Sequence, residues 1–199
     1  SRLLWQKDYG AALASPAFTD ISRTAVLVGT SAGRIYKLNP SSGSSCWGAT
    51  TDGCGSATGL DSYFCTNTGT NARSTSCTGS AVQKGIVTTA APYAGYFLVT
   101  TADGNVRLID STTGVQQWRT TIAGASAPLL LQGIGSGYVY VGSNTGTVHE
   151  LALTTGTQTG TRSVGGGSVI VGDPAYDGMN QKLYVSTSGG NLYAFSVPF

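Results

Sequence analysis

A phrase of fourteen residues occurs four times along the chain, and it constrains the fold more than any other feature of the sequence. The copies are AVLVGTSAGRIYKL at 25–38, YFLVTTADGNVRLI at 96–109, YVYVGSNTGTVHEL at 138–151 and KLYVSTSGGNLYAF at 182–195. Each copy reads as an apolar strand, a tight glycine turn and a second strand. The turn glycines, which are 71, 42 and 44 residues apart, are Gly33, Gly104, Gly146 and Gly190. This period of about 40 to 45 residues, with one long insertion, predicts four-stranded propeller blades.

A proline and a tryptophan extend the repeat beyond this phrase. A proline precedes the first strand of each copy, where a missing N–H is tolerated. These prolines are Pro16, Pro92, Pro128 and Pro174. Trp47 and Trp118 each follow a second glycine by four residues, a position that Gly160 takes in the third copy, and Trp5 precedes its proline by eleven residues. Because a tryptophan ring buries about 150 to 250 Å², we expect Trp5, Trp47 and Trp118 to dock outer strands on neighbouring blades.

The repeat resembles that of a known family. The strings GRIYKLNPSSGSSCW and GNVRLIDSTTGVQQW are similar to the repeat of quinoprotein (PQQ)-type β-propellers, in which a glycine, a strand, an Asp or Asn, a Thr-Gly turn and a tryptophan follow one another. The resemblance covers almost the whole chain outside roughly 44–84, and it implies an all-β propeller of four-stranded antiparallel sheets. It says little about activity, because the repeat occurs in quinone-dependent dehydrogenases and in non-catalytic envelope scaffolds.

The two ends of the chain carry complementary parts of one blade. The N-terminal LLWQKDYG, at 3–10, reads as an outer strand with no inner strands before it, whereas the last copy stops after its third strand. We therefore predict a single domain, 1–199, that forms a four-bladed propeller whose last blade is closed by the N-terminal strand, so that no sheet edge stays exposed. Two alternatives remain open: half of an eight-bladed ring completed by a second chain, and the C-terminal piece of a longer protein.

All four cysteines lie in an insertion at about 44–84, between the first and second copies. They are Cys46, Cys54, Cys65 and Cys77. The insertion is rich in Gly, Ser, Thr and Asn, and it has too little apolar surface to fold alone. We therefore expect two disulfides formed in an oxidising compartment, with all three pairings open. The absence of a C-x-x-C pair disfavours zinc. Such a stapled loop either recognises a partner or decorates the surface.

The charge and hydropathy of the chain exclude several classes of partner. Only 10% of the residues are charged and the net charge is +2, which is too small for a nucleic-acid or anionic-membrane surface. No stretch approaches the roughly 18 apolar residues that span a bilayer, so we expect no membrane insertion. The chain begins at Ser1, which is consistent with the removal of a signal peptide or a longer precursor.

Titratable residues are too few and too scattered to predict an active site. The one histidine, His149, occupies a strand position that is filled by Tyr36, Arg107 and Tyr193 in the other copies. A position that accepts such different side chains is tolerant rather than catalytic. The one glutamate is Glu150. We therefore expect no catalytic residue.

Metal and cofactor sites are also not predicted. The turn residues Asp103 and Asn105, and the segment with Asp173, Asp177 and Asn180, do not match the calcium loop D-x-[DN]-x-[DN]-G with its distal glutamate. Aspartate in such turns usually bonds the local backbone. The resemblance to quinone-dependent dehydrogenases implies an adjacent-cysteine disulfide near the cofactor, which this sequence lacks. We expect neither a bound metal nor a cofactor.

These observations favour a non-enzymatic, secreted or cell-surface β-propeller, with the periplasm as a further location. We expect it to bind a protein or to assemble with itself, for example as an outer domain of an extracellular filament or a pilus-associated complex. One alternative is a fragment or subunit of a quinone-dependent dehydrogenase. Another is a carbohydrate-binding propeller that uses Tyr63, Phe64 or Tyr138.

Overall fold

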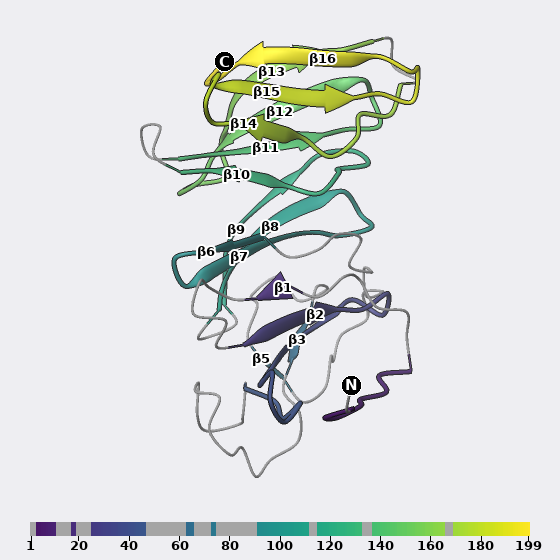
Figure 1. Ribbon diagram of the computed structural model, residues 1–199, viewed down its shortest axis with the longest axis vertical. Coiled ribbons are helices and arrows are strands. Elements are labelled where there is room, and N and C mark those ends of the chain that lie inside the picture. The colour runs from purple at the N-terminus through teal and green to yellow at the C-terminus, as the bar shows by residue number, and fades with distance from the viewer. Residues whose placement is uncertain are drawn as a thin grey trace. The chain divides into compact units, whose positions relative to one another are not determined.

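The repeats fold into four β-sheets (Figure 1). A computed structural model describes residues 3–10, 17–18, 25–46, 63–65, 73–74, 91–111, 115–132, 137–165 and 169–199. These residues contain strands and turns and no helix. The predicted all-β class and the one-sheet-per-repeat organisation are confirmed.

The first two sheets contain nine strands. The first sheet has the order β1-β2-β3-β4-β5, from Ala17–Phe18, Val26–Gly29, Arg34–Leu38, Tyr63–Cys65 and Arg73–Ser74. The second has the order β6-β7-β8-β9, from Ala91–Tyr93, Tyr96–Thr100, Asn105–Asp110 and Gln116–Thr121.

The last two sheets contain seven strands. The third sheet has the order β10-β11-β12-β13, from Leu129–Leu131, Tyr138–Gly142, Thr147–Ala152 and Gln158–Ser163. The fourth has the order β14-β15-β16, from Ala175–Asp177, Lys182–Ser186 and Leu192–Ser196. The chain divides into two compact units, Ser1–Ala102 with Leu108–Gln117, and Asp103–Arg107 with Trp118–Phe199.

The hairpin turn inside each repeat has the same construction. Its glycine has a positive φ in all four copies, between 73° and 79°, a conformation that a side chain disfavours. Three residues earlier stands a hydroxyl residue, and in three copies its side-chain oxygen accepts a hydrogen bond from the backbone N–H that follows the glycine. These residues are Thr30, Ser143 and Thr187. The second copy, at 96–109, has Thr101 at this position. The repeated phrase therefore encodes the turn in both its glycine and its hydroxyl.

The first sheet differs from the prediction because the insertion supplies two of its strands. β4 pairs with β3 through Arg34↔Cys65 and Ile35↔Phe64, and β5 pairs with β4. Of the residues after Gly43, those described up to Cys46 pair with the end of β3, where Cys46 N donates to Lys37 O at 2.7 Å. The insertion is therefore not only a loop, because its strands β4 and β5 extend the first sheet to five strands.

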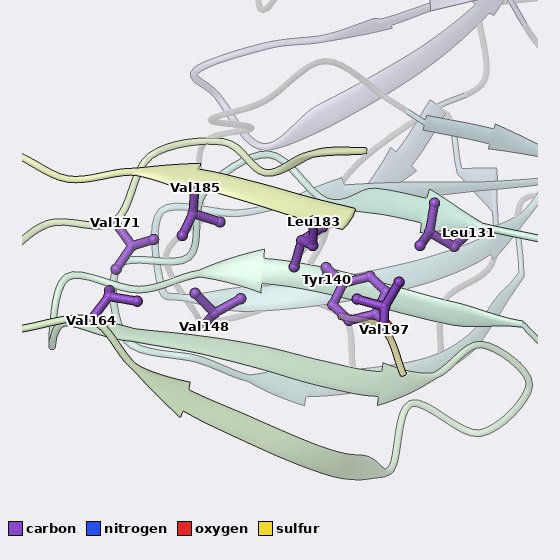
Figure 2. Packing of buried hydrophobic residues seen from close by; sticks show 8 residues of the cluster. All are labelled: Leu131, Tyr140, Val148, Val164, Val171, Leu183, Val185 and Val197. Carbon is purple, nitrogen blue, oxygen red and sulfur yellow. The ribbon is translucent and has the colours of Figure 1, made fainter. Parts of the chain in front are cut away.

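The main apolar cluster of the second unit lies between the third and fourth sheets. Tyr140 and Val148 of the third sheet meet Leu183 and Val185 of the fourth (Figure 2). All four side chains are at most 1% exposed. The cluster also includes Leu131, Val164, Val171 and Val197. The Val148 face of β12 thus packs against the fourth sheet.

The fourth sheet and the N-terminal segment are each described within their own unit. The described strands of the fourth sheet number three, and residues 3–10 belong to no strand. These N-terminal residues lie on the first repeat, where Trp5 and Tyr9 pack against a cluster of Val28, Tyr36 and Leu38. The rings of Tyr9 and Tyr36 stack with centroids 4.0 Å apart. The last sheet thus has three strands among the described residues, and its closure by the N-terminal segment stays a prediction.

Candidate functional site

One backbone carbonyl in each of the first three repeats receives a contact from the preceding part of the chain. It belongs to the residue seven positions after the turn glycine. Trp118 Nε1 donates to Leu153 O at 2.7 Å, and Trp5 Nε1 donates to Pro40 O at 2.8 Å. Leu153 and Pro40 are equivalent residues of the third and first repeats. The two tryptophans therefore make the same polar contact at different places in the chain.

The tryptophan rings lie directly on a second glycine of the repeat they contact. A Cβ at Gly156 would lie 2.5 Å from Trp118 Cε3, and one at Gly43 would lie 2.7 Å from Trp5 Cδ2. Both glycines have a positive φ, of 69° and 68°. Glycine is therefore required both for the turn and for the close approach of the ring. These contacts support a docking role for Trp5 and Trp118, and the role itself stays a prediction.

A lysine reaches the equivalent carbonyl of the second repeat. Lys37 Nζ, on β3, donates to Ser111 O at 2.8 Å, and the Lys37 side chain is 8% exposed. Burying an ammonium group is costly unless it is hydrogen-bonded, so this bond fixes the lysine in place. Trp47, which we predict to dock here, lies outside the described residues, as do its neighbours 48–50.

The contact from the third repeat to the end of the chain is different, because Gly160 replaces the tryptophan. The carbonyl group of Phe199 occupies the space that a Cβ at Gly160 would need. The Phe199 ring lies 5.4 Å from that of Tyr140, and the Arg162 guanidinium carbon lies 4.5 Å from its centroid. The C-terminal residues therefore fill the room that the missing tryptophan side chain leaves.

A buried carboxylate holds this C-terminal segment. Glu150, which is 2% exposed, accepts hydrogen bonds from Phe199 N at 2.7 Å, from the Tyr140 hydroxyl at 2.8 Å and from Thr159 Oγ1 at 2.8 Å. Burial, and then the hydrogen bond to Glu150, raise the pKa of Tyr140 well above its usual range. The phenol therefore remains a donor, and the cluster joins β11, β12, β13 and the end of the chain.

Sequence reasoning noted Glu150 only as the single glutamate and assigned it no role. The signal that points to it is a comparison of equivalent positions. Lys37, Leu108 and Ala194 stand four residues after the turn glycine in the other repeats. Lys37 and Glu150 are both buried polar residues that bond a backbone group further along the chain. The position is therefore one where a repeat contacts the next repeat.

The other candidate residues engage in local contacts. His149 Nδ1 lies 2.8 Å from Gln158 Oε1 on the neighbouring strand. The described residues contain no group of three or more His, Cys, Asp or Glu side chains that could hold a metal ion. Asp177 accepts bonds from Met179 N, Asn180 N and Asn180 Nδ2, and the bonds from Asn180 lower its pKa.

The two remaining aspartates considered for calcium also have protein partners. Asp173 Oδ1 accepts a hydrogen bond from Ala127 N at 2.8 Å. Asp103 accepts a longer bond from Asn105 N, at 3.4 Å, and its Oδ2 lies 3.6 Å from Arg107 Nη2. Asp103 thus serves its own turn, as aspartate in turns commonly does, whereas Asp173 bonds the backbone in front of β10.

The cysteines and the aromatic candidates are only partly described. Cys46 is buried and disulfide-bonded. Cys65 lies in β4, and Cys54 and Cys77 lie outside the described residues, so the pairing stays open. Of the residues considered for carbohydrate, Tyr138 is partly buried against the cluster between the third and fourth sheets. Tyr63 and Phe64 lie in β4, and their side chains are outside the description.

The repeated sheets and the equivalent docking contacts are those of a β-propeller. Residues 102–198 match the family model described as outer membrane protein assembly factor BamB. Residues 102–198 are therefore similar to the PQQ-like β-propeller repeat family, and the predicted resemblance is confirmed. No curated protein sequence gives a significant match.

Solved structures of other propellers are similar to the chain. BamB from Moraxella catarrhalis is 20% identical with a TM-score of 0.66, and the match covers 97% of this chain and 49% of that protein. The computationally designed Ika4 protein is 14% identical with a TM-score of 0.62, covering 100% and 99%. The C-terminal WD40 domain of Sif2 is 14% identical with a TM-score of 0.63, covering 97% and 48%. The chain thus spans about half the length of BamB.

Proposed function

We propose that this chain is a non-enzymatic scaffold that binds protein through the uncovered face of its fourth sheet. The observation that carries this proposal is the environment of Leu192. It stands two residues after the turn glycine, and its side chain is 71% exposed. The equivalent side chains, Ile35, Val106 and Val148, are at most 1% exposed. The sequence thus keeps an apolar residue at a position that is buried in each of the other three repeats.

The rest of this face is also accessible. β16 alternates between exposed residues, Leu192, Ala194 and Ser196, and partly buried ones, Tyr193 and Phe195. In the third sheet, the face that corresponds to Leu192 and Ala194 holds Val148 and Glu150, which are covered. An exposed apolar face with a free strand edge is a surface that other proteins bind.

The cellular setting in the proposal is extracellular, cell-surface or periplasmic. The disulfide of Cys46 supports an oxidising compartment. The family model carries the name of an outer membrane protein assembly factor, which supports an assembly role in the cell envelope. A place in an extracellular filament or pilus-associated complex is the more specific form of this hypothesis. None of the described residues forms a helix long and apolar enough to cross a membrane.

Two exposed apolar residues allow a matched test of the binding face. Leu192→Asp places a charge on the proposed face, and Met179→Asp places the same charge on a turn residue that is 96% exposed. Tagged protein of each variant is incubated with an envelope extract of the source organism, and the captured proteins are compared. We expect capture by the unaltered chain and by Met179→Asp, and loss of capture with Leu192→Asp. Equal capture by both variants would contradict the proposal, as would a bound quinone in the spectrum of the natively purified protein.

A further inference from the structure

The strand register of the first sheet narrows how the four cysteines of the insertion pair with one another. Cys46 is fully buried and disulfide-bonded. We propose that Cys46 is bonded to Cys77 and Cys54 to Cys65, so that one cross-link closes the base of the insertion and the other is nested within it in the sequence. This inference concerns the first sheet and is independent of the binding face proposed on the fourth.

Cys46 and Cys65 both pair with the same edge of β3. The strand β2 occupies the opposite edge. Ser45 forms an antiparallel bridge with the end of β3, and Cys46 N donates to Lys37 O at 2.7 Å, which places Cys46 beside Lys37. Cys65 pairs with Arg34. The chain therefore leaves this edge of β3 after Cys46 and returns to it with β4.

This spacing excludes a disulfide between Cys46 and Cys65. Their partners Lys37 and Arg34 are three residues apart, and a strand rises about 3.3 Å per residue, so the Cα atoms of the two cysteines are about 10 Å apart. A disulfide requires Cα atoms within about 7 Å. Positions 34 and 37 also belong to opposite faces of the sheet, because successive residues of a strand alternate. Cys46 is therefore bonded to one of the other two cysteines.

The direction of β5 favours Cys77 as the partner of Cys46. β5 is antiparallel to β4, and β4 is antiparallel to β3, so β5 runs in the same direction as β3. It therefore leads away from the end of β3 where Cys65 pairs and toward the end where Cys46 pairs. Ser74 ends β5, and Cys77 follows it by three residues.

The distances along this path are short enough for the proposed bond. Neighbouring strands are about 4.8 Å apart, and three residues span up to about 10 Å. Cys77 can therefore reach the position of Cys46 by continuing in the direction of β5. Reaching Cys65 would require the chain to reverse immediately after the strand. Cys77 lies outside the described residues, so its place is inferred from the strand that precedes it.

The second bond follows from the first. With Cys46 joined to Cys77, the two remaining cysteines are Cys54, which lies outside the described residues, and Cys65 of β4. Each bond forms from two thiols that lose two protons and two electrons. A disulfide oxidant of the compartment accepts them and is itself reduced to two thiols.

A cross-link at the base of the insertion also suits the strands that it encloses. β4 has three residues and β5 has two, and strands this short are marginal without further support. In the proposed pairing both strands lie between the two cysteines of the outer bond. The bond thus ties the chain after β5 to the row of Lys37, whose Nζ donates to Ser111 O.

A peptide map of the unaltered, oxidised protein tests the pairing. Trypsin together with a protease that cleaves before aspartate places each cysteine in its own peptide. These peptides are 38–51, 52–60, 61–73 and 74–84. The digest is made without reduction and at acidic pH to prevent exchange, and its masses are measured before and after reduction. We expect 38–51 linked to 74–84, and 52–60 linked to 61–73.

Any other linkage overturns the inference. A link between 38–51 and 61–73 would show that the register argument is wrong, and a link between 38–51 and 52–60 would show that β5 does not direct Cys77 to Cys46. Four unlinked peptides before reduction would also contradict it.

Thiol counts in paired variants give an independent check. Under denaturing conditions, we expect no free thiol in the double variant Cys46→Ser, Cys77→Ser, because Cys54 and Cys65 remain bonded. The matched variant Cys46→Ser, Cys54→Ser should contain two free thiols. Two free thiols in the first variant would contradict the pairing. If either variant fails to fold, the peptide map of the unaltered chain still decides the outcome.

Discussion

The third and fourth sheets are built from the same repeat, and they differ in what covers them. β12 has an outer strand on one side and a following repeat on its face, so that Val148 is fully buried. β16 is the edge strand of its described sheet, and Leu192, at the equivalent position, is largely exposed. The apolar residue is present in both. The fourth repeat thus keeps an apolar side chain at a position that is exposed in its own sheet and buried in the third.

The largest expected effect comes from placing a charge at each of these two positions. Val148→Asp buries a carboxylate among apolar side chains, and we expect a loss of unfolding free energy of about 3–5 kcal/mol or failure to fold. Leu192→Asp should change the stability of the isolated chain by less than about 0.5 kcal/mol, because exposed substitutions usually do. Urea unfolding followed by tryptophan fluorescence measures both. Similar losses at the two positions would show that Leu192 is buried in solution, and the contrast between the sheets would disappear.

The next effect concerns the contact that supports the third sheet from the second. Trp118 is 8% exposed, and its ring lies on Gly156. We expect Trp118→Ala to cost about 3–5 kcal/mol, the usual range for removing a large buried ring. Trp118→Phe keeps most of the ring but loses the bond to Leu153 O, and it should cost about 1–2 kcal/mol. Thermal and urea unfolding of both variants gives the comparison, and equal costs would mean that the hydrogen bond, rather than the ring, dominates.

The sequence predicts some features of this fold and not others. The fourfold phrase predicts the sheets and their turns, because glycine and a hydroxyl residue fix each hairpin locally. It also points to Trp5 and Trp118, whose spacing repeats. It does not predict that β4 pairs with β3, since the insertion has no repeated pattern to set a register. For residues 3–10 it predicts the outer strand of the last blade, and the structure describes Trp5 and Tyr9 of this segment in contact with the first repeat.

The contact between Gly160 and Phe199 could also not be predicted from the sequence. Reading along the repeat, Gly160 appears only as a missing tryptophan. The space is filled by Phe199, which is 39 residues further along the chain. No local pattern connects the two residues. The structure therefore shows a compensation between repeats that periodicity alone cannot reveal.

Adding a methyl group at Gly160 tests how far this compensation supports the third sheet. Gly160→Ala must displace the Phe199 carbonyl, and we expect a loss of about 1–3 kcal/mol, as for overpacking at other close contacts. Gly178→Ala is the matched control, because the nearest atom to its Cβ would be Tyr176 Cε1 at 3.7 Å, an ordinary contact. Urea unfolding should separate the two variants. If Gly160→Ala were as stable as Gly178→Ala, the C-terminal segment would not contribute to the stability of the third sheet.

The smallest expected effect is a loss of unfolding free energy at alkaline pH that comes from a tyrosine of the third sheet. Tyr140 of the third sheet is buried and bonded to Glu150, which raises its pKa above the ordinary value of 10.0, whereas its equivalent in the fourth sheet, Tyr184, is partly exposed. A group whose pKa is higher in the folded state than in the unfolded state stabilises the fold fully below the unfolded value. That contribution is lost as the pH rises above about 10. We therefore expect the unfolding free energy to fall with pH in this range, and Tyr140→Phe to flatten the fall. Urea unfolding at a series of pH values measures the slopes, and identical slopes in Tyr140→Phe and the unaltered chain would remove this electrostatic contribution of the third sheet.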